Sequence, residues 1–163
     1  MTIPLSKTFS GLALALALGL AAASPGAERV LRVPDLTISR GQSNWLALVL
    51  DAQGDENALG LSITFDQTLL TFLGAKRSSA ATNLSATLNV NSNQVALGRL
   101  GLAVALPAGE TVPAGATTLV EVLFRAAAGE TTVTTPIGFG NSPIFREVVD
   151  AEANELPASY VGG

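Results

Sequence analysis

The sequence predicts an all-β protein, a sandwich of two β-sheets with antiparallel strands, and three observations lead to this prediction. Apolar residues alternate with polar or small ones over much of the chain, as they do in strands that bury one face. Clusters of Gly, Pro, Asn, Asp and Ser separate these runs at intervals of roughly 8 to 12 residues. No segment carries a sustained 3.6-residue apolar repeat, so long amphipathic helices are not expected.

The alternation predicts between nine and eleven short strands. It is clearest in residues 59–65, 84–90, 120–126 and 133–139. Seven less regular runs complete the set: residues 29–33, 36–39, 45–51, 69–75, 95–104, 144–149 and 158–161. One helical turn is expected at residues 67–70, because Asp66 is a suitable N-cap residue.

The first 23 residues have the features of a secretory signal peptide. Lys7 precedes an apolar run at residues 11–23, and Ala21 and Ala23 match the small residues of a cleavage site. An uncleaved membrane anchor is the alternative, but a span needs roughly 20 apolar residues and this run is shorter. We therefore expect a secreted protein, extracellular or periplasmic, whose mature part is a single domain at residues 24–163.

The composition excludes several classes of protein. The chain has 163 residues with no Cys and no His. Disulfides, thiol nucleophiles, cysteine–zinc sites, catalytic triads with His and HExxH zinc sites are therefore all impossible. Nine Lys and Arg stand against 13 Asp and Glu, and this acidic balance argues against a nucleic-acid binder. The sequence thus predicts a binding module with no enzymatic activity, cofactor or metal.

Four segments together resemble the cohesin domain of cellulosome scaffoldins. They are GQSNWLALVL (41–50), LGLSITFDQTLLTF (59–72), GATTLVEVLF (115–124) and a short closing strand at residues 158–161. The resemblance extends over about residues 30–162 and implies a nine-stranded jelly-roll sandwich that binds a dockerin-like protein partner. Some carbohydrate-binding modules share this outline, so a fold of this kind does not by itself identify the ligand.

The resemblance also points to two positions that differ from the family pattern. Cohesins of the best-known type contact dockerin with an Asn and an Asp two residues apart, on the strand before the aromatic–Asp turn. Aligned on Phe65 and Asp66, these positions hold Ala58 and Gly60. The resemblance therefore implies a cohesin-like module in which the usual hydrogen-bonding groups for dockerin are missing.

Trp45, the single Trp of the chain, is the leading candidate for a binding residue. If Leu46, Leu48 and Leu50 point into the core, Trp45 points outward, and Leu123 and Arg125 point outward from another strand. An exposed Trp can anchor a protein partner or stack on a sugar, and the alternative is that other parts of the chain cover it. A second ring in line with Trp45 would favour polysaccharide binding, whereas an aliphatic face would favour a protein partner.

Two groups of acidic residues are the remaining candidates for chemistry. The loop DAQGDEN (51–57) offers oxygen ligands for Ca²⁺, although its spacing is not that of an EF-hand, and a solvated turn is the alternative. Glu147, Asp150, Glu152 and Glu155 precede the last predicted strand. Paired carboxylates can hydrolyse glycosides, but an interaction patch or a contribution to solubility fits this composition better.

Overall fold

The structure of the protein, a computed structural model, describes residues 28–35, 37–129 and 134–163. The predicted signal peptide at residues 1–23 lies outside these ranges, as do Leu36 and Val133 of two predicted strands. Within the described part of the chain, no helix combines the length and the hydrophobicity that crossing a membrane requires.

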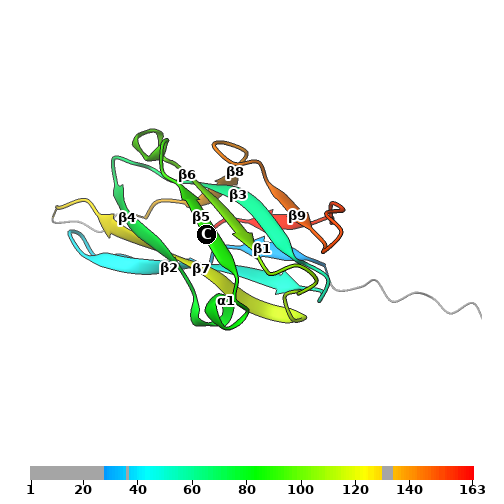
Figure 1. The fold of residues 1–163 in the computed structure, drawn as a ribbon. Helices are drawn as coiled ribbons and strands as arrows, with labels where there is room; N and C mark the ends of the chain where they lie inside the picture. Colours follow the sequence, from blue (N-terminus) through cyan, green and yellow to red (C-terminus); the bar gives the residue numbers. More distant parts are fainter. Residues whose placement is uncertain (1–27, 36, 130–133) are drawn as a thin grey trace, which may run out of the picture.

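The described residues form two β-sheets that face each other (Figure 1). The first sheet has the order β10–β1–β2–β7–β4, with β1 (Val30–Arg32), β2 (Ser43–Ala52), β4 (Leu70–Arg77), β7 (Gly115–Ala126) and β10 (Ser159–Val161). The second has the order β5–β6–β3–β8, with β3 (Ala58–Thr64), β5 (Thr87–Asn91), β6 (Arg99–Ala105) and β8 (Gly138–Gly140). A further strand, β9 (Glu147–Val149), also pairs with β3. The predicted sandwich is confirmed, and among the described strands only the pairing of β1 with β10 is parallel.

The alternation seen in the sequence fills the space between the sheets. On β2, the side chains of Leu46, Leu48 and Leu50 are at most 1% exposed, and on β3 those of Leu61 and Ile63 are fully buried. Because successive side chains of a strand point to opposite faces, each of these strands presents its intervening residues on the outer side of its sheet. Burying a Leu or Ile side chain contributes about 1.5–3 kcal/mol, so the core favours this register strongly.

Aromatic rings join the two sheets at two places. The ring of Phe124 on β7 is fully buried, and its centroid lies 4.9 Å from that of Phe65 and 6.3 Å from that of Phe72. Phe139 on β8 meets Tyr160 on β10, with the ring centroids 5.5 Å apart. Both groups have the tilted or edge-to-face geometry that aromatic quadrupoles prefer.

β8 and β9 occupy one position in the second sheet, beside β3. Gly140 at the end of β8 pairs with Ser62, and Glu147 at the start of β9 pairs with Gly60. Only one residue of β3 separates the two pairs, whereas residues 141–146 separate Gly140 from Glu147 along the chain. The ten strands of the described chain thus fill nine positions, in agreement with the nine-stranded sandwich that the sequence predicts.

The strand predicted at residues 84–90 begins only at Thr87, so this prediction is partly wrong. A short helix, α1 (Ser79–Asn83), precedes it. The Ser78 hydroxyl accepts a hydrogen bond from the Ala81 amide at 3.0 Å, and the Ala81 side chain is fully buried. The helix has small side chains and a single buried position, so the apolar periodicity that reveals longer helices is absent.

Other predicted strands are shorter or absent. A 3₁₀ turn, η1 (Val95–Leu97), replaces the start of the strand predicted at 95–104, and residues 37–39, 134–137 and 144–146 lie outside any strand. The 3₁₀ turn ends at Gly98, whose φ of +69° is left-handed. A Cβ atom here would lie 2.2 Å from the Phe65 carbonyl oxygen, so only glycine fits.

Asp66 shapes the connection between β3 and β4, where the single helical turn predicted at residues 67–70 is confirmed. The Leu70 amide donates to the Asp66 carbonyl at 2.8 Å, which closes one turn that does not continue. The Thr68 hydroxyl and amide donate to Asp66 Oδ1 at 2.6 and 2.8 Å. These hydrogen bonds hold the pKa of the Asp66 carboxyl below its ordinary value of 3.8.

Replacing the buried Phe124 tests the core. We expect Phe124→Ala to lower the free energy of unfolding by about 3–5 kcal/mol, because it removes a ring that packs on two others. Chemical denaturation measures this change. The matched control is Phe145→Ala, since Phe145 is 61% exposed and its loss should alter stability by about 0.5 kcal/mol or less. Equal effects of the two substitutions would contradict the described core.

Acid should destabilise the protein through carboxylates that the folded state keeps ionised. The pKa values of Asp51, Asp66 and Asp150 lie below 3.8 because Arg32, Thr68 and Asn154, respectively, donate hydrogen bonds to them. A lowered folded pKa contributes stability that is complete above the unfolded pKa and is lost as pH falls through the folded pKa. We therefore expect the Tm to fall steeply below about pH 4.

The variant Asp66→Ala separates this effect from general acid unfolding. This variant should have a lower Tm at pH 7 than the unchanged protein. Between pH 7 and acid pH, its Tm should then decrease by a smaller amount than the Tm of the unchanged protein. Glu152→Gln is the control, because no hydrogen bond or ion pair of the Glu152 carboxylate is found among the described residues. A Tm profile of Asp66→Ala that runs parallel to that of the unchanged protein would refute this assignment.

Candidate functional site

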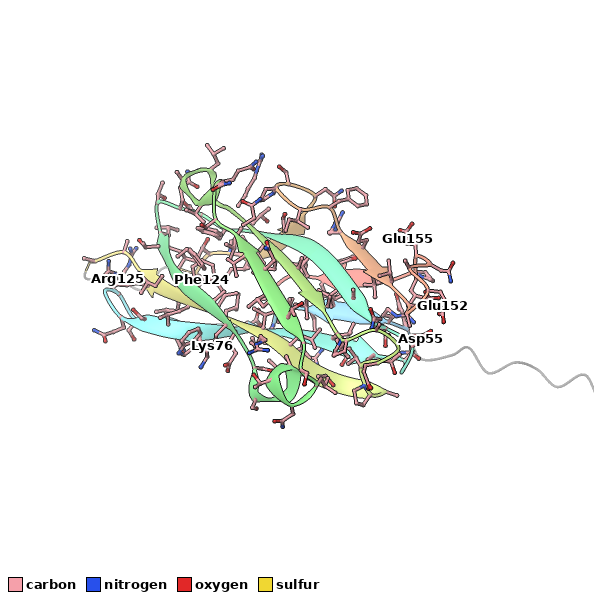
Figure 2. All side chains as sticks on the ribbon, viewed as in Figure 1. Asp55, Lys76, Phe124, Arg125, Glu152 and Glu155 are labelled. Carbon is pink, nitrogen blue, oxygen red and sulfur yellow. The ribbon has the colours of Figure 1, made fainter. Side chains whose placement is uncertain are left out.

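Trp45, Leu123 and Arg125 lie together on the outer face of the first sheet. The register of β2 and β7 pairs Trp45 with Leu123 and Ser43 with Arg125. Trp45 is 38% exposed, whereas the next residue, Leu46, is 1% exposed, as the alternation predicts. Figure 2 shows Arg125 and Lys76 on this sheet. The structure therefore brings together the three residues that the sequence selected, and their role in binding stays a prediction.

Three residues that the sequence analysis did not select complete this surface. Lys76 on β4 places its ammonium 4.3 Å from the centroid of the Trp45 ring, a cation–π distance. The same ammonium lies 3.2 Å from a carboxylate oxygen of Glu121, and the nearby Leu73 is 43% exposed. We call the surface formed by Trp45, Leu73, Lys76, Glu121, Leu123 and Arg125 the Trp45 face.

These additions could not be read from the sequence for a specific reason. The register of β4 and β7 shifts between Phe72 and Gly74, which marks a β-bulge at Leu73. The bulge places both Leu73 and Gly74 opposite the region of Leu123. The alternation of apolar and polar residues in a sequence rarely indicates where a bulge lies. Lys76 meets Trp45 only because β2 and β4 both pair with β7. Alternation of polar and apolar residues could have indicated only that Lys76 is exposed.

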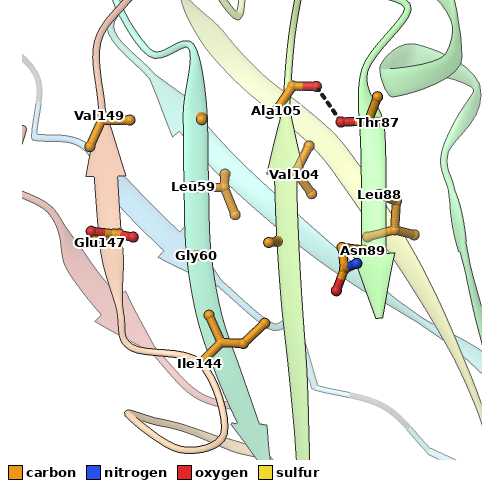
Figure 3. A pocket seen from close by; sticks show the side chains of 12 residues that line it. Leu59, Gly60, Thr87, Leu88, Asn89, Val104, Ala105, Ile144, Glu147 and Val149 are labelled. Carbon is orange, nitrogen blue, oxygen red and sulfur yellow. Dashed lines mark hydrogen bonds between the residues drawn. The ribbon is translucent and has the colours of Figure 1, made fainter. Parts of the chain in front are cut away.

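A second candidate surface is a groove of about 490 Å³ on the outer side of the other sheet (Figure 3). Its floor is made of small residues on β3 and β6: Ala58, Gly60, Ala103 and Ala105. Thr87 and Asn89 on β5 form one wall, and Ile144, Glu147 and Val149 form the other. The Thr87 hydroxyl donates to the Ala105 carbonyl at 3.2 Å, so this wall is attached to the floor.

Residues 141–146, which interrupt β8 and β9, fold over the same face of the sheet. The buried Ser62 hydroxyl donates to the Ile144 carbonyl at 2.7 Å and accepts from the Ile144 amide at 2.9 Å. A Cβ atom at Gly101 would lie 2.8 Å from Ile144 Cγ1 and 2.9 Å from Pro143 Cγ. The sheet can therefore accept this segment only because its residues there are small.

The same segment bears on the departure from the cohesin pattern at Gly60, but not on that at Ala58. Both residues line the groove, as the resemblance to cohesins implies for a contact surface. A Cβ atom at Gly60, however, would lie 3.1 Å from the Phe145 carbonyl oxygen and 3.2 Å from Ile144 Cγ2. A side chain at this position would therefore press on residues 141–146 and require them to shift. A glycine at position 60 is thus compatible with the way this chain covers its own sheet.

The loop at residues 51–57 holds an arginine rather than an open set of cation ligands. Glu56 is 1% exposed, and its carboxylate accepts from Arg29 Nε at 2.6 Å and from the Gln53 amide at 2.8 Å. Asp55 also accepts from Arg29, and Asp51 pairs with Arg32 at 2.8 Å. In the described residues, no group of three or more acidic side chains has a geometry that could hold a metal ion.

The acidic residues before β10 are divided between different tasks. Glu147 faces the groove, whereas Asp150 accepts hydrogen bonds from the Glu152 and Asn154 amides at 3.0 and 2.8 Å and so holds the turn after β9. Glu152 and Glu155 are exposed at the end of the molecule that also carries Asp55, opposite Arg125 (Figure 2). These carboxylates therefore give one end of the sandwich an acidic surface.

The described architecture defines a class of protein: a nine-position jelly-roll sandwich with one bare sheet face and one face that its own chain partly covers. No protein-family model and no curated protein matches the sequence. Solved structures do match, and they are cohesin domains. The chain has the cohesin fold.

Three of these structures illustrate the similarity. One is the sixth cohesin of Acetivibrio cellulolyticus scaffoldin B, in complex with a Cel5 dockerin mutant. It has a TM-score of 0.70 at 13% identity, and the matched region covers 83% of this chain and 96% of the cohesin chain. The OlpA cohesin of Clostridium thermocellum, in complex with a dockerin, has a TM-score of 0.69 at 14% identity, with coverage of 83% and 96%. A non-cellulosomal cohesin from the hyperthermophilic archaeon Archaeoglobus fulgidus has a TM-score of 0.67 at 12% identity, with coverage of 84% and 88%.

The crowding at Gly60 can be tested by substitution. We expect Gly60→Asp to lower the free energy of unfolding by about 1–3 kcal/mol, because the new side chain collides with residues 141–146. Ala58→Asn is the matched control. Ala58 is only partly buried, so its change should stay within about 0.5 kcal/mol. Thermal and chemical unfolding of both variants measure the difference.

A shortened chain identifies the cause of the collision. Replacing residues 141–146 with a single Val should join β8 and β9 in register, because only one residue of β3 separates their pairing partners. In this background, Gly60→Asp should cost much less stability than in the full chain. An unchanged cost would show that the collision does not come from residues 141–146.

Proposed function

We propose that this protein is a secreted, non-enzymatic binding module that holds a protein partner on its Trp45 face. Its fold is that of domains whose solved structures include complexes with dockerins. A dockerin-like protein or another cell-surface protein is the corresponding partner here. Secretion rests on the signal-like residues 1–23, and the absence of His and Cys removes the common catalytic groups.

The observation that carries the proposal is the exposed Trp45 among aliphatic neighbours. Trp45 is 38% exposed, Leu73 is 43% exposed, and Leu123 lies opposite Trp45 in the strand register. Binding energy in protein interfaces concentrates on a few anchors, of which Trp, Tyr and Arg are the most frequent. The Trp45 face offers a Trp and an Arg on adjoining strands of a rigid sheet.

The surroundings of Trp45 favour a protein over a polysaccharide. A flat sugar-binding face uses a row of aromatic rings, and among the described residues Trp45 has no second ring beside it on this side of the sheet. Phe72 points inward to Phe124, and Tyr160 packs on Phe139. The Trp45 ring also carries the Lys76 ammonium, which occupies part of the surface that a sugar would need. Carbohydrate binding therefore becomes the alternative outcome of the test.

The partial covering of the second sheet also favours the Trp45 face, on the first sheet, as the binding surface. Residues 141–146 cover the part of that sheet around Gly60, Ser62 and Gly101. A partner that docked there would have to displace a segment held by both hydrogen bonds of the Ser62 hydroxyl. Nothing in the described part of the chain covers Trp45 to a similar extent.

A pull-down with the immobilised protein tests the proposal. The bait is challenged in parallel with insoluble polysaccharides and with the secreted proteins of its source. We expect a protein to be captured, and Trp45→Ala to weaken its binding by about 2 kcal/mol or more, which is roughly a 30-fold loss of affinity. Release by a chelator would identify a partner with dockerin-like calcium loops.

The control variant is Leu97→Ala, because Leu97 is 66% exposed on η1 and lies outside the Trp45 face. It should retain the partner. Retention on a polysaccharide with competition by soluble sugar would replace the proposal with the carbohydrate-binding alternative. Full binding by a folded Trp45→Ala variant would show that the partner docks elsewhere.

A further inference from the structure

The Trp45 face and the residues paired with it in the strand registers form three rows of side chains across β2, β7 and β4. The first row contains Arg125 with Ser43 and Thr71, as the strand registers show. The second row is apolar and contains Leu123 with Trp45 beside the bulge at Leu73. The third row contains Glu121, which pairs with Lys76. Neighbouring rows are two residues apart along β7, which corresponds to roughly 7 Å in an extended strand.

The charges of these rows are not balanced. Glu121 is the single carboxylate of the Trp45 face, and Lys76 already neutralises it at 3.2 Å. Arg125 is exposed, and no hydrogen bond or ion pair of its guanidinium is found among the described residues. The acidic side chains Asp55, Glu152 and Glu155 lie at the far end of the molecule (Figure 2). An acidic protein therefore presents a cationic group next to its exposed Trp.

We infer that the partner segment carries a carboxylate about 7 Å from an aliphatic side chain. This inference rests on the proposed function, since it names the chemistry of a ligand for the Trp45 face. The aliphatic side chain would contact Trp45 and Leu123, and the carboxylate would pair with Arg125. A guanidinium binds a carboxylate with two parallel hydrogen bonds, so Arg125 would fix the direction of the segment as well as its charge.

Lys76 forms the other border of the apolar row. Its ammonium stacks on the Trp45 ring and pairs with Glu121, so the third row carries no net charge. The aliphatic residue of the partner would thus have the guanidinium of Arg125 on one side and a neutral ion pair on the other. The preference for an acidic neighbour in the partner therefore comes from Arg125, and complementary charge suppresses wrong partners in interfaces.

A hollow beyond Lys76 allows the segment to continue. It lies between the outer face of the first sheet and α1, and its lining includes Ala47, Thr117, Thr118 and Asn83. Lys76 and Glu121 belong to both this hollow and the Trp45 face. The two surfaces therefore form one continuous path along β7, and the hollow supplies hydroxyl and amide groups for a polar stretch of the partner.

Selection from a phage-displayed library of random 12-residue peptides tests this inference and does not require the natural partner to be identified first. The purified protein, Trp45→Ala, Arg125→Glu and Arg99→Glu are used as parallel baits. Arg99 is an exposed arginine on β6, so Arg99→Glu repeats the change of charge away from the Trp45 face. Binding of selected peptides to all four baits is then measured by isothermal titration calorimetry, because Trp45→Ala removes the single Trp of the chain and with it the Trp fluorescence.

The expected result is enrichment of Asp or Glu close to Leu, Ile or Val, with binding lost in Trp45→Ala. Arg125→Glu should weaken these peptides by at least about fivefold, more at low salt, and should itself select basic peptides. Arg99→Glu should select the same acidic peptides as the unchanged protein. Peptides that need Trp45 but show no acidic preference would overturn this inference and leave the proposed function intact. Peptides indifferent to Trp45, or no peptides at all, would count against both.

Discussion

The pairing of β7 with β2 and β4 is the constraint on which the arrangement of this protein depends. β7 is the longest strand, and its inward side chains, Val120, Val122 and Phe124, are fully buried. Since a strand alternates with a period of two, burying these three residues necessarily turns Glu121, Leu123 and Arg125 outward. A slip of one residue would bring Arg125 into the core. The free energy of core burial therefore also positions the candidate binding surface.

The two sheets have become different surfaces through the size of their outward residues. The first sheet presents Trp45, Leu123 and long charged side chains. The second presents Gly60, Ser62 and Gly101, which are small enough for residues 141–146 to lie on them. Residues 141–146 interrupt the strand formed by β8 and β9, and they pack on the outer face of the second sheet where its side chains are small. The difference between an open face and an occupied one thus depends on small outward side chains and on the two hydrogen bonds of the Ser62 hydroxyl.

Rigidity matters for a module that acts by surface contact. Arg29, the residue before β1, and Glu56 form a nearly buried ion pair that ties the start of β1 to the loop after β2, and the Gly54 amide of that loop donates to the other carboxylate oxygen. Such a network is costly to break because it would leave an unpaired buried charge. The side chains of the Trp45 face stand on strands rather than loops, so little backbone conformational entropy needs to be lost on binding.

The sequence by itself determined the fold class, the strands at residues 59–65 and 120–126, and the outward direction of Trp45, Leu123 and Arg125. These features depend on local alternation, which is visible in any stretch of chain. Only the tertiary structure decided that Lys76 lies over Trp45, that Leu73 is at a bulge, and that residues 141–146 pack closely on Gly60. These contacts join residues that are distant in sequence. They depend on which strands become neighbours, and a periodic pattern carries no information about that choice.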